Sequence, residues 1–502
     1  MKLVLSAALG LSLCAYAQQR PDESSMFGSD DSASDAGVAD ADGGVPRPNE
    51  DAMFGGGDLT SPDGGEDVGR GKEPATHDRD QEQLSGPGLK SLFDTGDEKV
   101  DWLKIGGLLY LRGTASWGLN QDPKDWTVTN PDLMDLYLDA RPNDRIRGFA
   151  LGRVTYDPTQ PPTNSFGQPN PSNPNVALDQ LWMRFDIEHQ VFLTVGRQKV
   201  KWGTGRLWQP TDFLNTVKRD PLQPFDLRLG VNAVKVHVPV EKLGWNFYGY
   251  GLLDNNGAAN TIGKLGGGIR GEFVIGPAEL GLDGAWVEGR TPRYGVDLSA
   301  ALGPIDVYAD VAFRSGQDFL IYNVNEGVDP RTNPLGAFTP KRLHGTVVQA
   351  TMGVAYAFNY TDKNTLTIGA EYFYNRPGAT NPEQYLPGIY TGNFTFFYNA
   401  RHYVGIFATS PGIPGFTWIT LNLTNLVNVS DPSGIVRFDA FFRVLTFLQF
   451  EAFVSANYGV KGGEFRFGGD FPAVPVSATQ TLGPFSVPYP VAQAGVGLRL
   501  SL

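Results

Sequence analysis

The feature that most constrains this fold is an alternation of apolar and polar residues, which recurs in about eighteen short segments from Trp102 to Leu502. Between Ile435 and Arg443, for example, the even-numbered positions hold Val436, Phe438, Ala440 and Phe442, whereas the odd-numbered positions include Arg437, Asp439 and Arg443. The set of alternate positions to which a residue belongs is called its parity. Successive side chains of a β-strand point to opposite faces, so each segment predicts a strand with one apolar and one polar face. The connections alternate between short and long, which is typical of a transmembrane β-barrel and is not required of a soluble β-sandwich.

The first residues predict a signal peptide over positions 1–17. Lys2 precedes an apolar segment from Leu3 to Leu13, and Ala15-Tyr16-Ala17 has the small-x-small form that signal peptidases cut. A helix of this length cannot cross about 30 Å of hydrocarbon. Cleavage after Ala17 would remove Cys14, the only cysteine of the chain, and would leave a mature protein without disulfide or thiol chemistry.

Residues 18–101 predict a disordered acidic tail in the periplasm. They carry 21 acidic and 7 basic residues, whereas residues 102–502 carry 33 of each. A segment that combines high net charge with many Gly, Ser and Pro residues cannot bury enough apolar surface to fold alone. The sequence Met-Phe-Gly begins at Met26 and again at Met53. This pattern either docks a periplasmic partner or reflects biased composition, and the sequence does not decide between the two.

Residues 102–502 predict an all-β, up-and-down antiparallel barrel of about eighteen strands in the outer membrane. Tight connections, such as Gly276-Pro277 and Gly303-Pro304, suit periplasmic turns, and the long ones suit external loops. The last strand alternates to its end and resembles the C-terminal strand that barrel assembly machinery recognises, although it ends in Leu502 rather than Phe. The strands are expected to begin near Lys104, Pro131, Arg145, Ala177, Gln190, Arg228, Gly244, Lys264, Ala278, Arg293, Pro304, Leu343, Asn364, Asn399, Pro414, Ser433, Thr446 and Tyr489.

Strand parity places charged residues on the inner face of the barrel, mainly in its first third. Charges of both signs that face one another across a lumen can screen solutes. Alternatively, these charges pair and solvate the lumen as every barrel requires, and the sequence leaves both interpretations open. The residues predicted to line the pore or its constriction are Arg112, Asp135, Asp139, Arg145, Arg147, Arg153, Arg184, Asp186, Arg197, Lys199, Lys201, Arg206, Asp212 and Arg228.

The alternation fails after Gly196. The lipid-facing parity of the segment 191–195 continues into Arg197, Lys199 and Lys201, and each such charge would cost roughly 2 to 4 kcal/mol at the bilayer midplane. Either a bulge near Gly196 exchanges the two faces, or the strand has left the membrane there. The following segment, 202–228, holds two Trp residues, Gly, Pro and several charges, and we expect it to fold inward and narrow the pore.

A series of four short motifs resembles outer-membrane porin families. The motifs are G-R-Q from Gly196, W-G from Trp202, P-T-D-F-x-N from Pro210 and D-x-R-x-G from Asp226. The similarity is greatest to the group of alginate-export-like barrels and related porins of unassigned substrate, and it covers roughly residues 102–502. The resemblance implies a diffusion channel with a constricting loop and with Arg197 near the constriction. The acidic tail is not part of the usual porin pattern.

The sequence therefore favours a passive channel for small hydrophilic solutes, embedded in outer-membrane lipid, with a mild preference for anions. A second hypothesis is a barrel that anchors a periplasmic partner of the tail. A third is an outer-membrane enzyme, which needs a nucleophile or a carboxylate-histidine pair, but the five histidines lie apart in the sequence. We predict no cofactor, no metal site and no nucleic-acid partner, because the sequence holds no metal-ligand spacing, phosphate-binding glycine motif or basic nucleic-acid surface.

Overall fold

A computed structural model of the chain describes residues 102–502, apart from 163–169, 171, 224, 254–264, 288, 317–320, 330–332, 362–363, 392–393, 472–473, 478–479 and 483. The predictions of a signal peptide and of a disordered acidic tail concern residues 1–101 and lie outside the described residues. In the described part of the chain, no helix is long and apolar enough to span a membrane.

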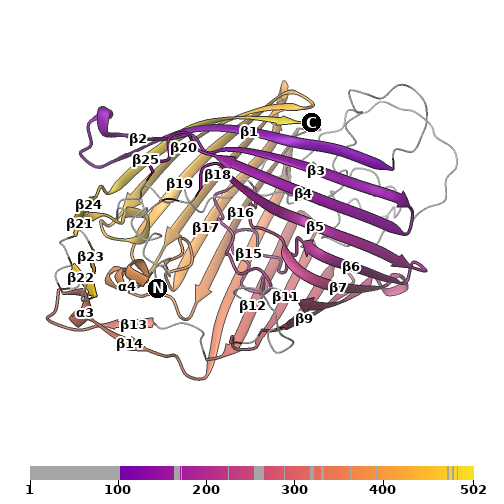
Figure 1. The fold of residues 1–502 in the computed structure, drawn as a ribbon, viewed down its shortest axis with the longest axis horizontal. Helices are drawn as coiled ribbons and strands as arrows, with labels where there is room; N and C mark the ends of the chain where they lie inside the picture. The colour runs from indigo at the N-terminus through magenta and orange to yellow at the C-terminus, as the bar shows by residue number, and fades with distance from the viewer. Residues whose placement is uncertain are drawn as a thin grey trace.

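Of the nineteen strands in the main sheet, eighteen form a closed antiparallel ring (Figure 1). Each pairs with the next, and the last closes on the first along a ladder that begins at Leu108 and Ser501. The nineteenth strand, β2 (Thr127–Thr129), pairs with β1. The ring consists of β1 (Leu103–Gly118), β3 (Asp132–Asn143), β4 (Ile146–Tyr156), β5 (Asn175–Ile187), β6 (Val191–Gln198), β7 (Val231–Val240), β8 (Trp245–Leu252), β9 (Gly266–Ile275), β10 (Ala278–Trp286), β11 (Arg293–Leu302), β12 (Ile305–Ser315), β15 (Thr346–Thr361), β16 (Asn364–Asn375), β17 (His402–Ile413), β18 (Phe416–Asn428), β19 (Ser433–Leu445), β20 (Leu448–Gly459) and β25 (Pro490–Ser501).

The predicted up-and-down barrel is thus confirmed. Each of the eighteen predicted segments begins within three residues of an observed ring strand. The alternation also has the expected orientation: in β19, Phe438 is 40% exposed, whereas Arg437 and Asp439 on either side of it are buried. Exposed apolar side chains follow the outer face around the ring, among them Leu136, Met183, Val236, Ile269, Leu298, Val354, Ile406 and Val454. An exposed apolar surface of this extent marks a face that meets lipid or another apolar partner.

The two ends of the barrel differ. At one end, here called the short-turn end, Gly276 and Gly303 take positive φ angles of 60° and 65°, which glycine adopts without steric cost in a tight turn. The helix η2 (Glu241–Leu243) forms another of these turns. Both termini of the ring lie at this end, where Gly107 and Leu502 exchange two backbone hydrogen bonds of 3.0 and 2.7 Å.

The opposite end, here called the long-loop end, carries the small elements on the left of Figure 1. They are η1 (Pro123–Asp125), β13 (Ile321–Val324), α3 (Pro334–Ala337), β14 (Phe338–Lys341), η4 (Pro382–Gln384), α4 (Tyr385–Thr391), η5 (Glu464–Arg466), β21 (Gly469–Phe471), β22 (Val474–Ser477), β23 (Gln480–Leu482) and β24 (Phe485–Val487).

A change of strand face occurs close to the predicted one, but in β5 instead of at Gly196. The strand β6 keeps one register with both of its neighbours through Gln198. In the ladder of β4 with β5, Leu151 pairs with Gln180 and Gly152 pairs with Leu178, so that Asp179 is an extra residue. A bulge of this kind re-aims side chains, and Asp179 and Gln180 are both fully buried. Of the two predicted alternatives, a bulge near Gly196 is therefore wrong in position, and the other, that the strand has left the membrane there, stays a prediction.

Candidate functional site

The long connection from β6 to β7, residues 199–230, contacts widely separated parts of the ring, and we call it the crossing loop. Its first half reaches side chains of β12, β16 and β17, and its second half returns to β1, β3 and β4. Since β16 is the eighth strand from β6 in a ring of eighteen, these contacts lie nearly opposite the point where the loop begins.

Asp310 of β12 is the first anchor of the crossing loop. Its fully buried carboxylate accepts hydrogen bonds from the backbone N–H of Thr204 at 2.9 Å and from the Thr204 hydroxyl at 2.6 Å. The same carboxylate accepts from the N–H of Gly205 and from the hydroxyl of Thr211, both at 3.3 Å. Hydrogen bonds to a charged acceptor are about twice as strong as neutral ones, so Asp310 fixes the start of the loop against the wall.

Glu371 of β16 is the second anchor. Its carboxylate accepts from three successive backbone N–H groups, those of Arg206 at 2.9 Å, Leu207 at 3.1 Å and Trp208 at 2.8 Å. The hydroxyl of Tyr308 donates a further bond of 2.9 Å. Successive N–H groups that point into one concavity form an anion-binding nest, and here the anion is a side chain of the barrel wall.

Aromatic packing reinforces both halves of the crossing loop. The fully buried Trp208 stacks on Phe373, with ring centroids 5.6 Å apart and planes 15° apart, and its indole N–H donates to the carbonyl of Phe397 at 3.0 Å. On the return path, Phe225 meets Tyr110 edge to face at 5.7 Å. Buried aromatic contacts of this type stabilise a single arrangement beyond the area they bury.

Ion pairs fix the second half of the crossing loop. Arg153 is 1% exposed; it binds both carboxylate oxygens of Asp135 at 2.8 Å and donates to the carbonyl of Leu227 at 3.3 Å. It also lies 3.2 Å from Asp179, the bulge residue. These contacts join β3, β4 and β5 to the loop through one guanidinium group.

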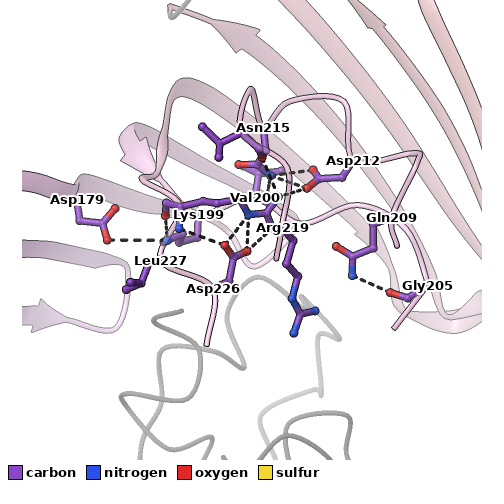
Figure 2. A network of polar contacts seen from close by, with 12 residues as sticks. Asp179, Lys199, Val200, Gly205, Gln209, Asp212, Asn215, Arg219, Asp226 and Leu227 are labelled. Atoms are coloured by element: carbon purple, nitrogen blue, oxygen red, sulfur yellow. Dashed lines mark hydrogen bonds and ion pairs between the residues drawn. The ribbon is translucent and has the colours of Figure 1, made fainter. Parts of the chain in front are cut away.

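Arg228 organises the end of the crossing loop. It lies 2.6 Å from Asp212 and also pairs with Asp226. Burial alone would raise the pKa of the Asp226 carboxyl, but the Arg228 guanidinium holds that pKa well below its usual range. Figure 2 shows the side chains of Asp212 and Asn215 directed toward each other, where the Asn215 amide donates at 2.8 Å, and Gln209 directed toward the carbonyl of Gly205, to which it donates at 2.9 Å.

About half of the predicted site residues meet at the crossing loop. Arg206 lies 3.2 Å from Asp306, Arg112 donates to Gln223 at 3.3 Å, and Lys199 donates to the carbonyl of Arg228. Together with the contacts above, the set that the structure brings to the loop is Arg112, Asp135, Arg153, Lys199, Arg206, Asp212 and Arg228.

Other predicted residues lie elsewhere. Arg145 is exposed in the turn before β4, which corrects its placement on the wall, and Asp186 contacts His189 in the next short turn. Arg197 pairs with the exposed Leu181 in the β5–β6 ladder and donates to the carbonyl of Leu178 at 2.8 Å, so it stays on the outer side of the ladder.

The last four predicted residues also lie apart from the two anchors. Asp139 and Arg147 pair with each other at 2.9 Å near the short-turn end. The Arg184 guanidinium lies over the ring of Phe192 at 4.5 Å. The half-buried Lys201 belongs to the crossing loop itself, at its beginning just after β6.

The two anchors, Asp310 and Glu371, are absent from the predicted set. Parity could have placed both carboxylates on the inner face, because they alternate with more accessible apolar residues of β12 and β16. It could not have supplied their partners, since Glu371 binds residues 163 to 165 positions away in the chain.

The closed ring, the apolar outer face and the crossing loop define this protein as an up-and-down antiparallel β-barrel whose interior is crossed by one of its own connections. No protein-family model matches its sequence, and no curated protein matches it. Among solved structures it is similar to a triple mutant of the Rhodopseudomonas blastica porin, with 12% identity, 80% of this chain and 100% of that chain covered, and a TM-score of 0.38. It is also similar to OccK8 (OprE) of Pseudomonas aeruginosa, with 9% identity, coverage of 80% and 98%, and a TM-score of 0.48.

Proposed function

We propose that this protein is an outer-membrane channel through which small hydrophilic solutes diffuse passively, with a mild preference for anions. One observation carries the proposal: a closed barrel, apolar outside and polar inside, is crossed by a loop anchored on opposite parts of its wall. A lumen narrowed by a fixed loop selects solutes by size and charge, and no bond is made or broken.

The outer face supports a membrane location for the barrel. Its exposed apolar side chains would be costly to hydrate, whereas lipid accepts them, and the closed ring leaves no strand edge with unpaired N–H and C=O groups in the hydrocarbon. We propose that the short-turn end faces the periplasm, since short periplasmic turns and long outer loops are the rule in such barrels. Both termini of the ring would then lie on the periplasmic side.

The charges on the inner face of the barrel support a mild rather than a strong preference. Among the basic residues predicted to line the pore, three lie within 3.2 Å of carboxylates: Arg147 at Asp139, Arg153 at Asp135 and Asp179, and Arg206 at Asp306. The fields of such pairs largely cancel at a distance, and salt screens what remains over about 8 Å. A passing solute therefore meets small local fields of both signs.

The test of this proposal is conductance across a planar bilayer that contains the purified full-length protein. We expect discrete current steps in potassium chloride. In a salt gradient, the reversal potential should have the sign of a channel that conducts chloride better than potassium. Swelling of proteoliposomes in uncharged sugars should become slower as the sugar grows, because the loop narrows the lumen. Heat-denatured protein from the same preparation is the control. Absence of current would refute the channel, and a cation-selective reversal potential would refute only the anion preference.

A further inference from the structure

A cavity of about 510 Å³ lies at the long-loop end, between the crossing loop and the walls of β11, β12 and β15. Four cationic side chains line it: Lys218 of the crossing loop, Arg290 of the β10–β11 connection, Arg293 of β11 and Arg314 of β12. Its other polar lining residues include Gln349 and Tyr398, and among the described residues that line the cavity there is no Asp or Glu. The lining therefore concentrates positive charge in one place.

Two of these cations are cross-strand neighbours in the sheet. Arg293 and Arg314 are directly opposite each other in the β11–β12 ladder, so their side chains leave the same face with Cβ atoms roughly 4.5 to 5.5 Å apart. An anion held between the two guanidinium groups would be attracted by both of them.

Lys218 brings a third charge toward the same pair. Burial lowers the pKa of the Lys218 ammonium to about 8. The charge of the nearby Asp212 acts against this shift, and the charges of Arg293, Arg228 and Arg314 add to it. The carboxylate of Asp212 is already engaged by Arg228 at 2.6 Å. An anion in the cavity would offset the cost of burying the Lys218 ammonium.

We infer that this cavity binds a small anion carrying two or more charged oxygens, which it would capture at the long-loop end of the channel. Guanidinium groups bind carboxylate and phosphate oxygens in pairs, and a neighbouring ammonium adds a third point of attraction. Pockets of roughly 300 to 1,000 Å³ hold small organic ligands, so the cavity admits a dicarboxylate together with water. The role in transport rests on the proposed channel function, but binding itself can be measured without transport.

The test is isothermal titration of succinate, and separately of inorganic phosphate, into the detergent-solubilised full-length protein at low ionic strength and pH 7. We expect both anions to bind the wild type and both affinities to fall about tenfold or more in Lys218→Gln and in Arg314→Gln. Lys242→Gln and Arg145→Gln, which remove the same charges from exposed turns at the short-turn end, should bind like the wild type. Lys218 lies on a loop, so its variant remains informative if the strand variant Arg314→Gln does not fold.

Absence of binding to the wild type, or equal binding by wild type and Lys218→Gln, would overturn the inference. Conductance measured on the same preparations separates this inference from the channel proposal. A conducting protein that binds neither anion refutes the site and leaves the channel intact. A protein that binds succinate but carries no current keeps the site and refutes the channel.

Discussion

Glu371→Gln should loosen the crossing loop. The wild-type carboxylate offers two oxygens to the N–H groups of Arg206, Leu207 and Trp208 and to the hydroxyl of Tyr308. The amide of Gln keeps one oxygen and replaces the other by an NH2 group, which is a donor facing donors. Whichever way the amide turns, at least one of these groups loses its acceptor.

The expected cost follows from these contacts. A buried N–H that loses its partner costs about 1 to 3 kcal/mol, and bonds to a neutral acceptor are weaker than those to a carboxylate. Against this, an amide is cheaper to bury than a charge. We expect local opening of the loop to become easier by about 2 to 4 kcal/mol, which corresponds to roughly 30- to 1,000-fold in its equilibrium constant.

Hydrogen exchange measures this opening directly. The amides of residues 206–208 should exchange roughly 30- to 1,000-fold faster in Glu371→Gln, whereas amides of the β1–β25 ladder should not change. Glu241→Gln, in the exposed short-turn helix η2, is the matched control. Unchanged exchange at residues 206–208 in a folded variant would refute the anchoring role of Glu371.

Three further predictions concern other parts of the site. Trp208→Ala removes the ring stacked on Phe373, and truncating a buried Trp to Ala costs about 3 to 5 kcal/mol. Trypsin should therefore cleave after Lys218 and Arg219 much faster in this variant than in the wild type. Equal cleavage rates would argue against aromatic packing as an anchor of the loop. Arg153→Met leaves Asp135 and Asp179 buried without this cation and should lower the free energy of unfolding by about 3 to 5 kcal/mol. Circular dichroism should show a lower melting temperature for this variant than for Arg145→Gln. Succinate affinity should fall as the pH rises from 7 to 9, because Lys218 loses its proton near pH 8. The other charged or titratable groups that face it are Arg228, Arg290, Arg293, Arg314, Asp212 and Tyr398, and burial raises the pKa of Tyr398 above this range. Lys218→Gln should not show this step, and an identical pH dependence in both proteins would contradict the assignment.

The barrel was predictable because its determinants are local. Each strand has its own period of two, as in β19, where Phe438 faces outward and Arg437 and Asp439 face inward. Gly276 and Gly303 likewise mark short turns within a few residues of the strands they join. Once one face of each strand is apolar, register and strand order leave few alternatives.

The site was only partly predictable because its contacts are distant in sequence. The composition of the segment 202–228 predicted a specific structure there. Arg228, at the end of this segment, pairs with Asp212, and Arg153 of β4 pairs with Asp135, and all four residues were predicted to line the pore. The acceptors Asp310 and Glu371, however, lie about 100 and 165 positions from the amides they bind. Strand parity alone places Arg197 on the outer side, where the structure has it. The predicted inward position needed a bulge near Gly196, whereas the bulge lies in the partner strand β5 at Asp179.

The central claim, that the crossing loop constricts a conducting barrel, is tested most directly by single-channel conductance before and after shortening the loop. Residues 203–226 would be replaced by a short Gly-Ser linker, and a change in gel mobility on heating would verify that the barrel is folded. We expect small current steps for the wild type and steps several-fold larger for the folded, shortened variant in the same salt. Equal conductance of the two proteins, or no current from either, would contradict it.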